Sequence, residues 1–284
     1  MSATTFATPV ATARPPHRPG GSFTRMVRAE LRRVTRPRTR AGIAVGATAF
    51  AVVAGISTFA AASDTAVASR RGGVPLGDLL GAGGATEAFA VGASFGGFLV
   101  FVTFIAVIAG EFSGGTFRAL VLRYPNRLGV IVGKLTALLA VTAAAVALAE
   151  LLTVGVSLAM APGQDVSTSG WFSADGLGAA VTDFGTAFAG LAGWAVFGTT
   201  VAVIFRSVPL ALGVGFAWAG PFENIVADSW SPGIRFFPGQ VLGSVVRGGT
   251  VELGFARAAA TALAYTAVAA TVTLVLTARR DVTA

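Results

Sequence analysis

Six long apolar stretches divide the sequence, and each is long enough to cross a bilayer. They cover residues 41–63, 87–110, 129–160, 179–205, 208–227 and 256–278. A helix needs about 20 mainly apolar residues to span the hydrocarbon core, and the backbone there must bond to itself. The pattern therefore predicts an all-α integral membrane protein with six transmembrane helices, built as one domain over residues 41–280.

Two segments of a different kind precede the first stretch. Residues 1–21 are polar and rich in proline, which predicts a disordered tail. Residues 22–36 alternate apolar and basic side chains at helical spacing, with Phe23, Met26 and Val34 opposite Arg25 and Arg32. This pattern predicts an N-terminal amphipathic helix that lies in the lipid headgroup layer. A solvated basic helix is the alternative.

Composition supports the membrane class and excludes several kinds of chemistry. The chain is 54% hydrophobic and 12% charged, against roughly 45–50% and about 25% in soluble domains. It has no cysteine, and its single histidine, His17, lies in the polar tail. Thiolate sites, histidine metal sites and histidine-dependent catalysis are therefore excluded, and we assign no catalytic residue and no metal ligand.

The net charge of +8 is distributed unevenly between the predicted loops. Most of the 21 Lys and Arg residues precede the first stretch, lie between the second and third or the fourth and fifth, or follow the sixth. Positively charged loops stay in the cytoplasm. The distribution predicts a multi-pass protein of the cell (plasma) membrane, with both termini cytoplasmic. This orientation accounts for the positions of the basic residues, so no nucleic-acid partner is expected.

The loop at 111–127 has the features of a short surface helix. Gly114 and Gly115 permit a tight turn out of the membrane, and Thr116 is placed to cap a helix. An apolar stripe that includes Phe117 follows, and Pro125 ends the helix. Such a helix would act as a lever on the second and third stretches if a soluble partner pressed on it.

One run of residues begins in this loop and extends into the third stretch: Glu111, Gly115, Thr116, Arg118, Pro125, Arg127 and Lys134. This run resembles the signature of type-2 ABC exporter permeases. The resemblance implies a six-span permease domain that dimerises with an identical or related copy and binds two copies of a separate ATPase subunit. It also implies a cytoplasmic coupling helix that docks on the ATPase, with Glu111 near Arg118 or Arg127. Ordinary membrane anchoring of the charges is the alternative. The implied coupling residues are Glu111, Gly115, Thr116, Phe117, Arg118, Pro125, Arg127 and Lys134.

No nucleotide-binding motif is present in the chain itself. The nearest candidate, Gly133-Lys134, lacks the upstream glycine and is followed by Leu135 where magnesium binding requires Ser or Thr. The chain is therefore expected not to be an enzyme and to carry no cofactor, with ATP and magnesium bound by the partner ATPase. A non-transporting scaffold or sensor that binds an ATPase is the alternative function.

Aromatic residues and two acids within the stretches are candidates for a substrate path. An apolar path would suit a drug, a peptide or a lipid. Glu150 attracts cations or, alternatively, forms a structural hydrogen bond, because a charge at this depth is costly. Glu223 contacts substrate or, alternatively, faces outside water. The candidates are Phe98, Phe101, Glu150, Phe216, Trp218 and Glu223.

The segment at 228–255 is too polar to span and too apolar for a free loop. Pro238 is placed to begin a short helix that runs to Val246, and Gly248 and Gly249 stop it. In the resembling family an outer helical hairpin between spans five and six caps the exit at this place. A surface loop with aromatic residues at the membrane interface is the alternative.

Overall fold

Six long helices carry the apolar stretches of the sequence. The computed structural model describes residues 21–62, 74–124 and 126–280. Within these ranges, six helices are long and apolar enough to cross a membrane. They indicate a multi-pass membrane protein and confirm the predicted all-α membrane class. The predicted tail before Gly21 and the predicted helix stop at Pro125 lie outside the described residues.

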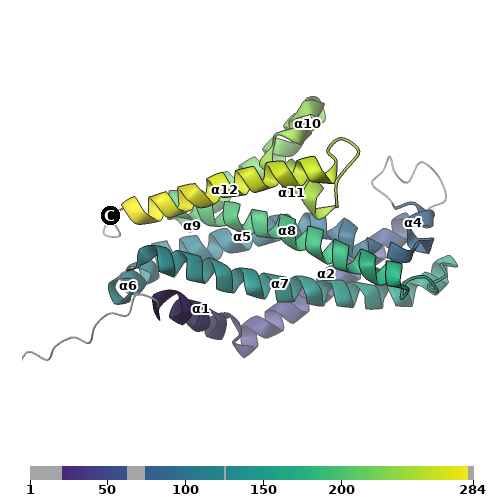
Figure 1. The fold of residues 1–284 in the computed structure, drawn as a ribbon, viewed down its shortest axis with the longest axis horizontal. Helices are drawn as coiled ribbons and strands as arrows, with labels where there is room; N and C mark the ends of the chain where they lie inside the picture. The colour runs from purple at the N-terminus through teal and green to yellow at the C-terminus, as the bar shows by residue number, and fades with distance from the viewer. Residues whose placement is uncertain (1–20, 63–73, 125, 281–284) are drawn as a thin grey trace, which may run out of the picture.

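The observed helices follow the predicted boundaries closely (Figure 1). The spans are α2 (Pro37–Ala61), α5 (Glu87–Ser113), α7 (Arg127–Met160), α8 (Ala174–Phe205), the broken helix Val208–Ser229 and α12 (Phe255–Arg279). The shorter helices are α1 (Gly21–Val34), α4 (Leu76–Leu80), α6 (Thr116–Arg123) and α11 (Pro238–Val246). Short 3₁₀ turns occupy Ala82–Ala85, Ala161–Gln164 and Ser231–Arg235.

The fifth span is broken by one turn of π-helix. It consists of α9 (Val208–Ala217), the π turn Trp218–Phe222 and α10 (Glu223–Ser229). Pro221 lies inside this turn. Proline has no N–H to donate and its ring clashes with the preceding turn, so a wider turn accommodates it. Figure 1 shows α10 projecting away from the other helices.

The main hydrophobic core lies around α5 and α8. Phe101, Phe104 and Ile105 on α5 pack with Ala195 and Val203 on α8, and all five are buried. In its most apolar stretch 61% of α8 is buried, compared with 17% of α12. Because α8 is central, the surrounding helices pack against it, whereas most of the apolar surface of α12 is not covered by other helices.

The helix α11 is buried beside α8 instead of lying in a surface loop. Its bounds, Pro238–Val246, are those predicted, and Val241, Leu242 and Val245 on it are buried. A Cβ atom on Gly190 of α8 would lie 2.3 Å from Cγ2 of Val246, so only glycine permits this close approach. The segment 228–255 is therefore not a surface loop throughout, because α11 adds a helix to the core, whereas Trp230 and Phe236 in the same segment are exposed.

A smaller cluster closes the end of the bundle opposite to α6. The indole Nε1 of Trp171 donates a hydrogen bond to the carbonyl oxygen of Leu79 at 3.0 Å. Phe59, Leu79 and Trp171 are buried together. This contact attaches α4, which no sequence pattern predicted, to the loop before α8.

Candidate functional site

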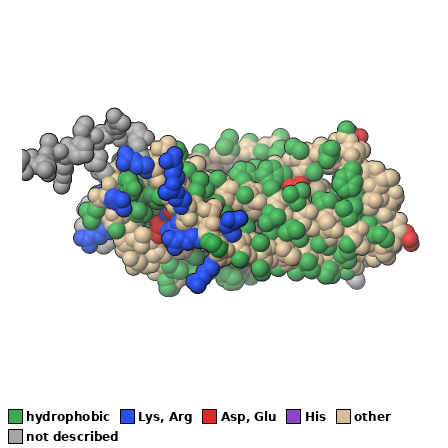
Figure 2. All heavy atoms as spheres, turned by 90° about the horizontal axis from the view of Figure 1, so that it is seen from below, with side chains coloured by type: hydrophobic (Ala, Val, Ile, Leu, Met, Phe, Trp, Pro, Cys, Tyr) green, Lys and Arg blue, Asp and Glu red, His purple; other side chains and the backbone are tan. Residues whose placement is uncertain are grey.

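One end of the bundle carries most of the basic side chains among the described residues. The helices α1 and α6, the turn between α8 and α9, and the last turn of α12 all lie there (Figure 1). On the face drawn in Figure 2, the Lys and Arg side chains gather at this end, and hydrophobic side chains are spread over the rest of the face. We call it the basic end. Its charge agrees with the predicted cytoplasmic side.

The short helix α6 is held at the basic end by a turn that requires glycine. Gly115 has a φ of +70° and stands at the N-cap of α6 (Thr116–Arg123), a conformation that side chains with a Cβ rarely adopt. The helix α6 confirms the short helix that was predicted in this loop. The predicted cap is wrong in detail, because no side chain caps α6 and Gly115, rather than Thr116, occupies the N-cap.

Two acids and two bases form a cluster where α1, α5 and α7 meet, and three of the four side chains are buried. The Nζ atom of Lys134 lies 2.6 Å from Oε2 of Glu30 and 2.7 Å from Oε1 of Glu111. Lys134 is 0% exposed, and the side chains of Glu30 and Glu111 are 3% and 4% exposed. Arg33 also pairs with Glu111 and lies 3.6 Å from Oε1 of Glu30. We call these four residues the charged cluster.

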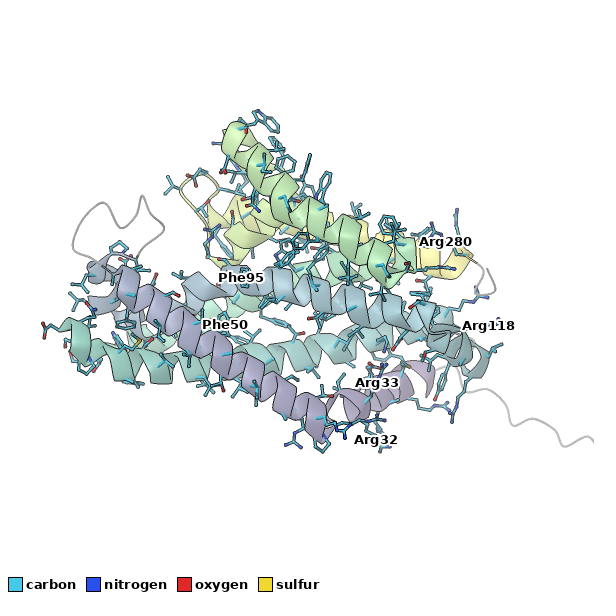
Figure 3. All side chains as sticks on the ribbon, turned by 180° about the vertical axis from the view of Figure 1, so that it is seen from behind. Arg32, Arg33, Phe50, Phe95, Arg118 and Arg280 are labelled. Atoms are coloured by element: carbon cyan, nitrogen blue, oxygen red, sulfur yellow. The ribbon has the colours of Figure 1, made fainter. Side chains whose placement is uncertain are left out.

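The charged cluster joins three helices that are distant in sequence. Glu30 and Arg33 come from α1, Glu111 from the last turn of α5, and Lys134 from the first part of α7. Figure 3 places Arg33 on the side of α1 toward the other helices and Arg32 on its outer side. The hydrogen bond to Glu111 raises the pKa of Arg33 above its ordinary value. The formal charges of the cluster sum to zero, so each acid is compensated where it is buried.

The expected neighbours of Glu111 are not its partners. The resemblance implied that Glu111 lies near Arg118 or Arg127, but the structure pairs it with Arg33 and Lys134. The side chain of Arg118 is exposed on α6, and Nη1 of Arg127 donates to the carbonyl oxygen of Arg280 at 3.2 Å. Arg118 is therefore free to contact another molecule, whereas Arg127 ties the start of α7 to the end of α12.

A second set of contacts joins α6 to the turn between α8 and α9. Phe117 is buried, and its ring centroid lies 4.4 Å from that of Phe112 on α5. The guanidinium carbon of Arg206 lies 5.4 Å from the centre of the Phe112 ring, within the range of a cation–π interaction. Burial lowers the pKa of Arg206, and the nearby Arg280 lowers it further. A displacement of α6 would therefore move Phe112 and, through its contact with Arg206, the end of α8.

The aromatic candidates of spans two and five meet toward the other end of the bundle. The ring centroid of Phe98 lies 5.6 Å from that of Phe216 and 6.5 Å from that of Phe101. Phe98 and Phe216 line a cavity of about 480 Å³ that Asn224 and Arg247 also line. Phe101 is buried behind it. These three predicted residues lie close together, and the cavity that Phe98 and Phe216 border is partly polar.

Glu223 has a structural environment that neither sequence interpretation described. It is 1% exposed, and it accepts hydrogen bonds from Nε1 of Trp218 at 2.6 Å and from the backbone N–H of Gly239 at 2.8 Å. The expectation that Glu223 faces outside water is wrong. Its carboxylate joins α10 to the start of α11, and neither Glu223 nor Trp218 lines the cavity beside Phe98.

Glu150 is buried on the inward face of α7. Its exposed fraction is 8%, and Val146, one turn earlier, packs with Phe89 of α5 and Leu191 of α8. The carboxyl thus points toward the interior of the bundle rather than toward lipid. A role in a cation path and a structural role both remain predictions.

The sequence did not lead us to predict Glu30 and Arg33 as site residues, although its apolar pattern indicates a buried role for Glu30. Glu30 stands four residues after Met26 and four before Val34, so it interrupts the apolar stripe of α1. Lys134 likewise lies on the buried face of α7, beside Ile131 and Leu138. A charge on an apolar helical face requires a buried partner of opposite sign, and matching these positions would have suggested the pair.

Comparison with protein-family models finds no match to this chain, and comparison with curated protein sequences finds none either. A function for the chain must therefore be argued from its own residues and their geometry.

Proposed function

We propose that this chain is the membrane-spanning permease subunit of an ATP-driven ABC exporter, which works as a dimer and is coupled to a separate ATPase subunit through residues 111–127. Its substrate is a hydrophobic or amphipathic compound such as a drug, a peptide or a lipid. The observation that carries the proposal is the position of an exposed helix, α6, directly after the end of α5, where Glu111 pairs with α1 and α7 in the charged cluster and Phe112 contacts Phe117 and Arg206.

The surface of α6 has the character of a protein contact. Arg118 and Leu122 are exposed on it, and 81% of the Leu122 side chain is accessible. Phe117 on the opposite face anchors the helix to α5. A soluble ATPase that grips the outer face of α6 would move the helix as a unit, because Gly115 and the Phe117–Phe112 contact fix its position relative to α5.

Movement of α6 would reach the spans through contacts that resist bending. Glu111 is only five residues before Thr116 and pairs with both α1 and α7, so the ends of α5 and α7 and the whole of α1 shift together. Separating these charges in a buried site is costly. The same displacement reaches the end of α8 through Phe112 and Arg206. Force generated by ATP binding therefore spreads over several helices.

In this proposal the transport path runs beside spans two and five. Their aromatic residues Phe98 and Phe216 border a shared cavity, and Phe95, Phe216 and Trp218 are largely exposed on the outside of a single chain. Exposed aromatic surface of this kind favours contact with a second copy or with an apolar substrate. A path enclosed by two copies would use these side chains for a substrate with apolar groups.

The test is ATP hydrolysis by a complex of this chain with the ABC ATPase encoded nearest to its gene. We expect the two proteins to purify together, and Arg118→Ala to reduce transport-linked hydrolysis several-fold while leaving the chain folded. Arg257→Ala is the matched control, because Arg257 is also exposed but begins α12 at the far end. The chain would instead be a scaffold if the complex forms and neither substitution changes hydrolysis or transport. Failure of the two proteins to associate would remove the proposal.

A further inference from the structure

We propose that an anionic phospholipid binds in the groove between α2 and α7 at the basic end, with an acyl chain in the groove and its phosphate beside Arg38 and Arg40. The groove has a volume of about 780 Å³ and lies under the bend between α1 and α2. This inference does not depend on the proposed transport function.

The groove exists because α2 and α7 diverge toward the basic end. At the far end the helices touch, and a Cβ atom on Gly55 would lie 2.4 Å from Cγ1 of Val156. Nearer the basic end, residues 37–44 of α2 and 140–148 of α7 line the two sides of the open groove instead. The space between the helices is therefore left open where lipid would surround the bundle.

The walls of the groove match an aliphatic chain. Leu31 and Val34 of α1 form its start, Ile43 and Ala44 of α2 one wall, and residues 140–148 of α7 the other. At 1.5 Å of rise per residue, this part of α7 extends for about 12 Å along the direction of the spans. A chain bound here would run from the membrane surface toward the middle of the bilayer, as an acyl chain does.

The mouth of the groove carries positive charge that the described residues do not neutralise. Arg40 lines the groove, and Arg36 and Arg38 are the sequence neighbours of Pro37, which also lines it. All three arginine side chains are exposed. None of the three takes part in the ion pairs found among the described residues, because Glu30 and Glu111 are already bound to Lys134 and Arg33. The positive N-terminal end of the α2 dipole adds to this field.

A phospholipid satisfies both features at once, whereas other ligands satisfy one. A nucleic acid or an acidic peptide would meet the arginines but leave the apolar groove empty. A neutral lipid would fill the groove but leave the arginines without a partner. Charge complementarity at the mouth therefore selects an anionic headgroup, since each base near a membrane surface favours anionic lipid by about 1 kcal/mol.

Lipid retention measured by native mass spectrometry tests this inference. The full chain would be purified in detergent and mixed with equal amounts of palmitoyl-oleoyl phosphatidylglycerol and the phosphatidylcholine with the same acyl chains. We expect the wild-type chain to retain the phosphatidylglycerol preferentially. The double variant Arg38→Ala/Arg40→Ala should lower that preference roughly 10- to 30-fold. Ala144→Trp should abolish retention of both lipids, because Ala144 lines the groove.

Two control variants distinguish the groove from general surface effects. Arg118→Ala/Arg123→Ala removes two exposed bases from the same end but away from the groove, and Ala267→Trp adds a large side chain on exposed α12. Both should retain lipid as the wild type does. Equal retention of the two lipids by the wild type would overturn the inference, as would an equal loss in the Arg118/Arg123 variant. A change of oligomeric state in Ala144→Trp with unchanged lipid retention would show instead that a second copy occupies the groove.

Discussion

Replacing Lys134 by methionine is expected to lower the stability of the chain by about 3–5 kcal/mol, because it leaves two buried carboxylates with one partly exposed base. Lys134 is fully buried and contacts both Glu30 and Glu111 at less than 3 Å. Methionine fills a similar volume, so the loss of charge is the main change. In detergent, the apparent melting temperature should fall by on the order of 10 °C.

A second substitution separates the effect of charge from that of packing. The double variant Lys134→Met/Glu111→Gln leaves one acid and one base in the cluster, Glu30 and Arg33, which lie 3.6 Å apart. The net charge of the cluster is again zero, so part of the lost stability should be recovered. Arg33→Ala should cost less than Lys134→Met, because half of the Arg33 side chain is exposed and water screens its interactions. If Lys134→Met melts like the wild type, the charged cluster does not hold α1, α5 and α7 together.

The second large effect is expected at Gly190, where α11 approaches α8. A Cβ atom at this position would lie 2.3 Å from a methyl carbon of Val246 and 3.0 Å from the carbonyl oxygen of Leu242. Gly190→Leu should therefore force α11 away from α8, at a cost of about 1–3 kcal/mol or more. A cysteine at Ser244, which is 1% exposed, should become reactive toward a maleimide once α11 is displaced. The chain has no other cysteine, so the labelling is specific.

The same helix provides a control for this experiment. A Cβ atom on Gly185 of α8 would meet nothing within 4 Å. Gly185→Leu should therefore leave the cysteine at Ser244 protected, and it removes a residue that weakens helices. Equal protection of Ser244 in the two variants would mean that α11 is not held against α8 at Gly190.

The sequence predicts the spans well because hydropathy and length decide them. The fourth and fifth spans are separated only by Arg206 and Ser207, and the structure ends α8 at Phe205 and begins α9 at Val208. The helix at Pro238–Val246 was also predicted, since proline begins it and two glycines of positive φ follow it. These are local properties, so neighbouring residues are enough to identify them.

The partners of buried charges cannot be predicted from neighbouring residues, because they depend on how the helices pack. Glu111 was expected near Arg118 or Arg127, which are close in sequence, but its partners come from α1 and α7. Glu223 was expected to contact substrate or to face water, yet it is covered by Trp218 and the start of α11. Hydropathy identifies a residue as charged within an apolar segment, but only the packing of the helices determines which group neutralises it.

The exposure of α6 is the feature on which the proposed coupling depends, and crosslinking measures its partner directly. A photoreactive benzoylphenylalanine in place of Arg118 would be activated in whole cells, with the same residue in place of Arg257 as the control. Both positions are exposed, but they lie at opposite ends of the bundle. We predict that position 118 captures a protein with an ATP-binding-cassette phosphate loop and that position 257 does not. Capture of no such ATPase from position 118, or equal capture from both positions, would contradict the account.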